Sequence, residues 1–104
     1  MTDPKRPDDC QSMPEVRAGV DATDRALMEL LDRRFGYMRA AARIKTDRST
    51  VRDEARKRQV IEAARSDAMA RGLPAEDIAV IWEALVEASI AYELGEWDRV
   101  RSDA

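Results

Sequence analysis

The chain has 104 residues, 38% of them charged and 44% apolar, and its formal net charge is −3. A chain of this length holds one small hydrophobic core, alone or shared with a second copy. One cysteine and no histidine exclude intrachain disulfides, tetrahedral zinc sites and imidazole acid–base catalysis. Only four glycines and four prolines occur, and no stretch alternates β-branched with polar residues, so the composition predicts an all-α fold.

Residues 1–11 are polar, contain two prolines and show no periodicity, so we predict a flexible N-terminal arm there. A single helical domain is predicted over residues 12–104. No run in it approaches the roughly 20 apolar residues of a membrane span, and no apolar block follows the first cations. We therefore expect a cytoplasmic protein without membrane contact.

The first helix of the domain begins at a capping box, Ser12-x-x-Glu15, which satisfies donors of the first turn. No glycine or proline signal strong enough to stop a helix follows until about Lys45. The residues predicted to face inward along this helix are Val20, Leu27, Leu31, Arg34, Met38, Ala41 and Lys45. Two of these positions carry cations, which is unusual for a buried face.

Two further helices follow the connection at residues 46–53. Residues 54–71 predict a short helix that ends before Gly72, and residues 73–101 predict a long one, opened by Pro74 with acids in its first turn. The predicted order is long, short, long. A first helix of about 30 residues would be about 45 Å long, too long for the other two to cover. An intertwined helical homodimer that shares one core is therefore the predicted assembly.

Positive charge is concentrated in residues 33–58, where ten lysines and arginines accompany three acids. A solvated basic surface for nucleic acid or a partner is one interpretation. The spacing favours another, because Arg34 and Lys45 are eleven residues apart and return to within roughly 20° of the same direction on a helix. Both then lie on the apolar stripe. A buried cation needs a carboxylate nearby, supplied either by the protein or by a ligand.

Several motifs follow one another in order: Arg17-x6-Asp24, the Arg33–Arg34 pair, Lys45 eleven residues after Arg34, Asp53-x-x-Arg56 and Ser89-x3-Glu93. With these motifs the sequence, from about Asp9 to Trp97, resembles the all-helical (type II) chorismate mutases and their relatives, the isochorismate-pyruvate lyases. The stretch GYMRAAARIK, residues 36–45, is more similar to the lyase branch.

The resemblance implies a pericyclic reaction on a dicarboxylate that carries an enolpyruvyl ether, so neither a nucleophile nor a cofactor is expected. It implies that Arg34 clamps one carboxylate of the substrate, for which the forked guanidinium suits better than an ammonium. It also implies that Lys45 binds the ether oxygen and a neighbouring carboxylate. Lys45 would then stabilise the negative charge that develops as the C–O bond stretches.

Arg17 lies seventeen residues before Arg34 on the same predicted helix, about 25 Å along its axis and too far to touch the same small ligand. In the family this arginine enters the site of the other subunit, and the resemblance implies the same here. The alternative interpretation is a surface arginine paired with Asp21 one turn later.

The resemblance also implies substrate contacts for Asp53, Arg56, Ser89 and Glu93. Arg56 would position the substrate through its carboxylates, with Asp53 near the ring hydroxyl, while Ser89 and Glu93 share one face of the third helix. Ser89 can equally be a small packing residue. Glu93 departs from the glutamine of most relatives, and only a protonated carboxyl could donate to an ether oxygen. Lys57 departs from the glutamate that mutases often carry, which puts the ring-hydroxyl contacts in doubt.

The predicted function is that of a chorismate mutase, an isomerase that converts chorismate to prephenate without a cofactor or metal, as in aromatic amino acid biosynthesis. The alternative within the family is an isochorismate-pyruvate lyase of salicylate biosynthesis with side mutase activity. An alternative of another class is a non-enzymatic dimeric helical protein that binds nucleic acid or a partner. The inward positions of Arg34 and Lys45 argue against nucleic acid, because a phosphate-binding face needs its cations outside.

Overall fold

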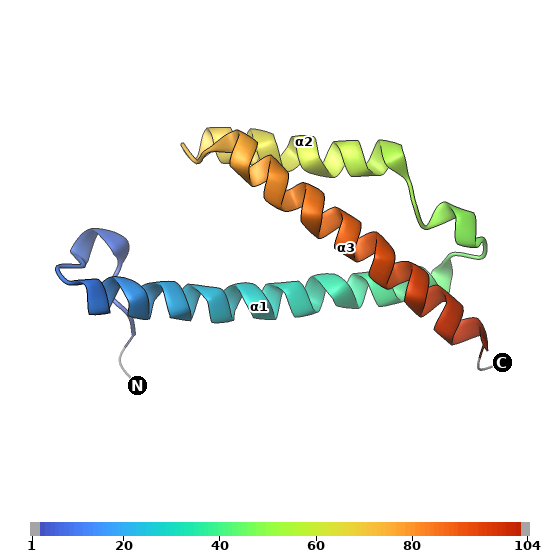
Figure 1. Cartoon of the computed structure of the whole chain (residues 1–104), viewed down its shortest axis with the longest axis horizontal. Helices are drawn as coiled ribbons and strands as arrows, with labels where there is room; N and C mark the ends of the chain where they lie inside the picture. The colour runs from blue at the N-terminus through green and yellow to red at the C-terminus, as the bar shows by residue number, and fades with distance from the viewer. Residues whose placement is uncertain (1–2, 103–104) are drawn as a thin grey trace. The chain divides into compact units, whose positions relative to one another are not determined.

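The structure is a computed structural model that describes residues 3–102. It contains three α-helices, α1 (Met13–Ile44), α2 (Glu54–Ala70) and α3 (Ala75–Ser102), and 3₁₀ turns at Pro7–Asp9 and Arg48–Thr50. No strand occurs among the described residues. The predicted all-α fold with a long, a short and a long helix is confirmed (Figure 1). The chain divides into an N-terminal unit, Met1–Gly36, and a C-terminal unit, Tyr37–Ala104, and α1 runs through the boundary.

The start of α1 is fixed by the predicted capping box. The Glu15 backbone N–H donates to Ser12 Oγ at 3.4 Å, and Glu15 Oε1 accepts from the Gln11 backbone N–H at 2.9 Å. Lys5 Nζ lies 2.6 Å from Glu15 Oε2, and this ammonium is the main reason that the pKa of Glu15 is lowered to about 2. The predicted flexibility of residues 1–11 concerns motion and stays a prediction, although Lys5 ties part of this segment to α1.

The first half of the predicted inward stripe is not buried in the single chain. Val20 is 52% exposed and Leu27 is 53% exposed, which agrees with a first helix too long for the other two to cover; burial of these residues in a homodimer stays a prediction. The physical reason for their exposure is that the described N-terminal unit contains one α-helix and a 3₁₀ turn, and no second α-helix against which this face could pack. Leu31, Met38 and the other later members of the stripe are half-buried.

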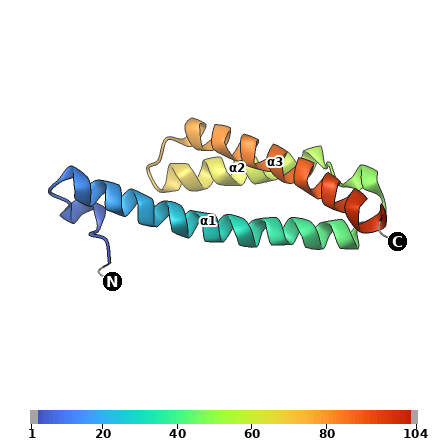
Figure 2. The same cartoon turned by 60° about the horizontal axis from the view of Figure 1, so that its bottom comes forward.

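The core of the C-terminal unit lies where α3 packs against α2 and the preceding connection. Val51, Val86 and Ile90 are buried there, and partly buried side chains surround them: Val60, Ile61, Leu94 and Trp97. Figures 1 and 2 show α2 and α3 joined by a tight turn and running in opposite directions. Gly72 makes that turn at a φ of 71°, a left-handed conformation that favours glycine and confirms the predicted end of the second helix.

Candidate functional site

A partly buried ion pair joins the C-terminal end of α1 to α3. Lys45 Nζ lies 2.8 Å from Glu93 Oε2, and the two side chains are 30% and 6% exposed. The same ammonium lies 3.4 Å from the Val51 carbonyl oxygen, to which it donates. Lys45 follows the last residue of α1, and its backbone N–H still donates to Ala41 in helical register. The protein itself therefore supplies the carboxylate that the inward cation requires.

The contact between Lys45 and Glu93 is electrostatic and poorly directed. Although the two atoms are close, Glu93 Oε2 has no hydrogen bond of good geometry among the described residues. The pair is a charge contact, because 2.8 Å is well within ion-pair range and an ion pair does not require a directed hydrogen bond. A buried carboxylate oxygen without a directed donor retains acceptor capacity. The Lys45 ammonium is thus able to exchange Glu93 for a negatively charged group of a ligand.

Ser89 lies one turn before Glu93 on α3, and both residues are buried. Its Oγ donates to the Leu85 carbonyl oxygen at 2.7 Å, a bond to the preceding turn that serines in helices often make. The structure thus brings Lys45, Ser89 and Glu93 into one buried region of the C-terminal unit. The substrate role of Ser89 stays a prediction.

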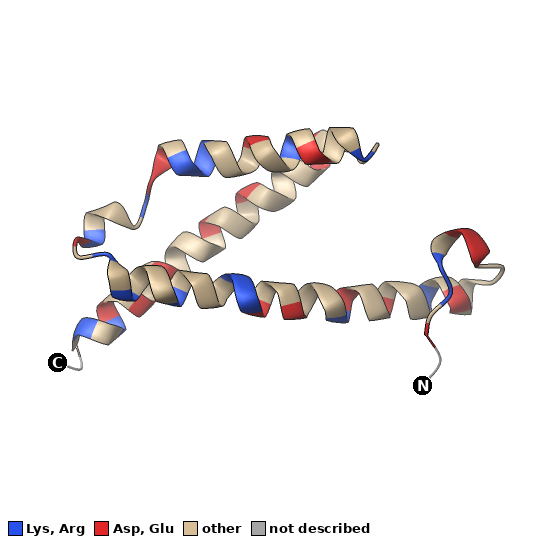
Figure 3. Ribbon diagram, turned by 180° about the vertical axis from the view of Figure 1, so that it is seen from behind, with Lys and Arg blue, Asp and Glu red and all other residues tan. Residues whose placement is uncertain are grey.

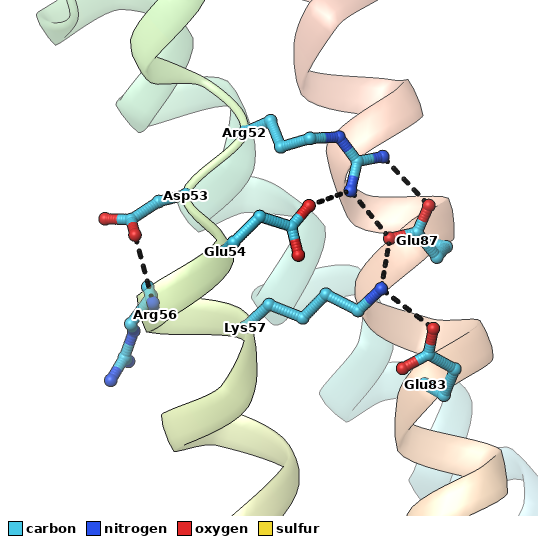
Figure 4. Close-up of polar contacts among 7 residues, drawn as sticks. All are labelled: Arg52, Asp53, Glu54, Arg56, Lys57, Glu83 and Glu87. Atoms are coloured by element: carbon cyan, nitrogen blue, oxygen red, sulfur yellow. Dashed lines mark hydrogen bonds and ion pairs between the residues drawn. The ribbon is translucent and has the colours of Figure 1, made fainter.

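Asp53 and Arg56 occupy the first turn of α2. Asp53 is the N-cap residue, and its Oδ1 accepts from the Arg56 backbone N–H at 3.0 Å, which satisfies one of the free donors of a helix start. The Arg56 side chain is exposed, with Nη1 3.4 Å from Gln59 Oε1. In Figure 4 the Asp53 and Arg56 side chains point away from α3. Asp53 therefore has a structural task in addition to any contact with a ligand.

An ion-pair cluster on the other side of α2 was not predicted from the sequence. Lys57 Nζ lies 2.8 Å from both Glu83 and Glu87, and the Arg52 guanidinium contacts Glu87 through both Nη atoms at 2.9 and 3.1 Å (Figure 4). Arg52 also pairs with Glu54 at 2.9 Å. These bonds, to Arg52 first and then to Lys57, lower the pKa of Glu87 to about 2. The spacing of Glu83 and Glu87, one turn apart on α3, was the signal available in the sequence.

This cluster predicts a specific loss of stability in acid. The folded-state pKa of Glu87 lies below its ordinary value of 4.5, so the stabilisation is present above about pH 4.5 and is lost as the pH falls toward 2. Glu87→Gln should remove part of that dependence. The measurement is urea unfolding at several pH values between 7 and 2.5. Glu29→Gln, a change at an exposed glutamate that makes no ion pair among the described residues, is the control. Equal acid slopes for wild type and Glu87→Gln would contradict the prediction.

Arg17 and Arg34 lie on the part of α1 that belongs to the N-terminal unit. Arg17 is exposed and Arg34 is half-buried. The alternative of an ion pair between Arg17 and Asp21 is not realised among the described side chains. The substrate contacts predicted for both arginines stay predictions.

The basic segment of residues 33–58 is partly neutralised, because four of its cations, Lys45, Arg48, Arg52 and Lys57, form ion pairs with acids of α3. Figure 3 shows basic residues toward the end of α1 and at the start of α2, and acidic residues along α3. The Arg48 guanidinium contacts both carboxylate oxygens of Asp98 at 2.8 and 3.1 Å. Arg39 Nη1 donates to the Tyr92 hydroxyl at 3.0 Å. Part of the local positive charge therefore has carboxylate partners within the protein.

Residues 3–102 contain no cluster of three potential metal ligands and no helix long and apolar enough to cross a membrane.

Comparison with known proteins gives two findings. Residues 16–94 match the family described as chorismate mutase type II. The chain is also similar to an isochorismate pyruvate lyase from Pseudomonas aeruginosa, with 25% identity over 100 residues that cover 96% of this chain and 99% of the relative. Residues 16–94 include all of the site residues predicted from the sequence: Arg17, Arg34, Lys45, Asp53, Arg56, Ser89 and Glu93.

Proposed function

Because the chain belongs to the type II chorismate mutase family, and is thus an enzyme of that family, we propose that it rearranges chorismate to prephenate. The observation that carries the proposal is the pair of Lys45 and Glu93. It places an ammonium beside a buried carboxyl. A pericyclic reaction needs neither a nucleophile nor a cofactor, only a held conformation and a charge at the breaking C–O bond.

In this proposal Lys45 binds the ether oxygen. Its contribution is larger in the transition state than in the ground state, because negative charge accumulates on that oxygen as the bond stretches. Glu93, when protonated, donates a second hydrogen bond to the same oxygen. When ionised, it holds the Lys45 ammonium and competes with the substrate for it. The short contact between these two side chains supports such a competition.

Arg34 and Arg17 are proposed to bind the substrate carboxylates, Arg17 from the partner subunit of a homodimer. The exposed apolar residues of α1 support the dimer, since Val16, Val20, Leu27, Met28 and Leu30 are all more than one third exposed in the single chain. Side chains of this size on one helix are typical of a face that packs against another chain. Arg56, Asp53 and Ser89 complete the proposed set of substrate contacts.

Isochorismate-pyruvate lyase activity with side mutase activity is the second candidate. The similarity over nearly the full length of the Pseudomonas aeruginosa lyase supports it. Both reactions take a dicarboxylate with an enolpyruvyl ether and proceed through a cyclic shift of electrons, so the same Lys45 serves either one.

A non-enzymatic protein that binds nucleic acid is disfavoured because acids of α3 already pair with four cations of the basic segment, Lys45 among them. A thermal-shift assay separates the classes, since a ligand that binds the folded state raises the unfolding temperature. The bicyclic dicarboxylate that mimics the chorismate transition state should raise it, and duplex DNA should leave it unchanged. The reverse result would overturn the proposal.

Glu93→Gln is expected to keep kcat/KM at or above the wild-type value with chorismate. Glutamine keeps the shape of the side chain, supplies a permanent N–H donor for the ether oxygen and carries no charge that competes with the substrate for Lys45. The measurement is kcat/KM of both proteins in the same buffer. A variant slower than wild type by about tenfold or more would show that the reaction needs the carboxyl group itself, and that Glu93 is not a donor that an amide can replace.

A further inference from the structure

Two side chains near the end of α3 donate to the main chain at the end of α1. The last carbonyl groups of a helix lack intrahelical donors, and here α3 supplies them. Arg101 Nη1 donates to the Ala42 carbonyl at 3.0 Å, and Arg101 Nη2 donates to the Lys45 carbonyl at 2.5 Å. Trp97 Nε1 donates to the same Lys45 carbonyl at 3.0 Å. The main chain of Lys45 is thereby held by two donors from another helix.

The two donors also hold each other. The Arg101 guanidinium carbon lies 4.0 Å from the centroid of the Trp97 ring, a cation–π distance. Arg101 Nη1 donates in addition to the Trp97 carbonyl at 3.2 Å. Both side chains are half-buried. A planar guanidinium with several fixed donors loses little further freedom once it is stacked, so this pair is a rigid support for the carbonyl it contacts.

Glu93, Trp97 and Arg101 follow one another at intervals of four residues, which places them on one stripe of α3. Residues of this stripe contact both the main chain and the side-chain ammonium of Lys45. Trp97 and Arg101 hold its carbonyl oxygen, and Glu93 holds its ammonium. The Lys45 side chain extends from this main chain, so the main-chain position sets the region that the ammonium can reach, and contacts with Glu93 and the Val51 carbonyl select a place within it.

We propose that Trp97 and Arg101 are positioning residues that set where the Lys45 ammonium stands. This inference rests on the proposed function in so far as it assigns Lys45 to catalysis. Neither residue is proposed to touch the substrate, since the donors described here are directed at main-chain carbonyl oxygens, those of Ala42, Lys45 and Trp97. Their effect on the reaction passes through Lys45, and a displacement of about 1 Å is enough to lower a rate substantially.

Steady-state kinetics with chorismate form the first arm of the test. Arg101→Ala and Trp97→Phe should each lower kcat about tenfold, with KM changed less than twofold. Arg101→Lys keeps the charge near the helix end but cannot bridge two carbonyls, so it should restore only part of kcat. Arg99→Ala, at a residue that pairs with Glu96 at 2.8 Å, is the matched control and should leave kcat unchanged. Unchanged kcat in both Arg101→Ala and Trp97→Phe, or full rescue by Arg101→Lys, would overturn the proposal.

The second arm does not depend on activity. Urea unfolding of Lys45→Met, Glu93→Gln and the double variant gives the coupling between Lys45 and Glu93. The same three substitutions are then made in the Arg101→Ala background, where the coupling energy should fall to less than half of its value in the wild-type background. If the Arg101→Ala protein does not fold, the Trp97→Phe background is used instead. A support for the fold alone would lower overall stability and leave the coupling intact, and that result overturns the proposal whatever kcat does. Absence of turnover by wild type on chorismate and isochorismate would refute the proposed function, while the coupling would still decide the positioning role.

Discussion

Replacement of Lys45 by alanine should abolish turnover, with a loss of about a thousandfold in kcat, the upper range seen when one donor to a developing oxyanion is removed. The reason is that Lys45 acts on charge that is absent from the bound substrate and present in the transition state. KM should change much less, because Arg34 and Arg17 would still bind the substrate carboxylates when the contact of Lys45 with one of them is lost. The measurement is chorismate consumption under saturating conditions, with the uncatalysed rate subtracted.

The same change leaves Glu93 as a buried carboxyl without its cation, which is costly for a folded protein. Lys45→Ala combined with Glu93→Gln is therefore the matched control, since a neutral amide replaces the orphaned charge. We expect this double variant to be folded by circular dichroism, dimeric by sedimentation and still inactive. Recovery of turnover in the double variant, or loss of the fold in it, would mean that Lys45 is a structural partner of Glu93 and not the catalytic cation.

Mixing Arg17→Ala subunits with Arg34→Ala subunits should restore activity that neither variant shows alone. If each site takes Arg34 from one subunit and Arg17 from its partner, a mixed dimer has one intact site and one site that lacks both arginines. Random exchange makes half of the dimers mixed, so the recovered activity should approach about a quarter of wild type. Activity of the mixture is measured after subunit exchange, over the time course of that exchange.

The control for this experiment is a mixture of Arg17→Ala with a doubly substituted Arg17→Ala, Arg34→Ala chain, which contains no intact site in any combination. Native mass spectrometry of the mixture establishes that subunits have exchanged. Mixed dimers without recovered activity would remove the shared site and leave Arg17 as a surface residue.

Local sequence signals predicted the helices well. Ser12 and Glu15 form the cap that their spacing indicates, and Gly72 adopts the left-handed conformation that ends α2. Each of these signals acts within a few residues of the chain, where sequence spacing and spatial distance coincide. The apolar periodicity of α1 predicted which residues share one face of the helix. It does not indicate whether the same chain or a second chain packs against that face, and Val20 and Leu27 are exposed in the single chain.

The candidate site was only partly predictable for the same reason. Periodicity placed Lys45 on an inward stripe, and the structure shows that Glu93, far along the sequence, supplies its carboxylate. The contacts of Arg101 and Trp97 with the Lys45 carbonyl could not be predicted from the sequence. Every residue has a main-chain carbonyl, so the residue types do not indicate which carbonyl accepts a hydrogen bond. Lys57 was recognised as a departure, but its two glutamate partners became evident only when α2 and α3 were placed side by side.

Product analysis tests the central claim most directly. Purified wild-type protein is incubated separately with chorismate and with isochorismate, and prephenate, salicylate and pyruvate are quantified over time against enzyme-free controls. We predict that the wild-type protein forms prephenate from chorismate and that Lys45→Ala does not. Salicylate and pyruvate formed in equal amounts from isochorismate would identify the lyase reaction as an additional or principal activity. Neither set of products above the uncatalysed rate, from protein shown to be folded, would contradict the account.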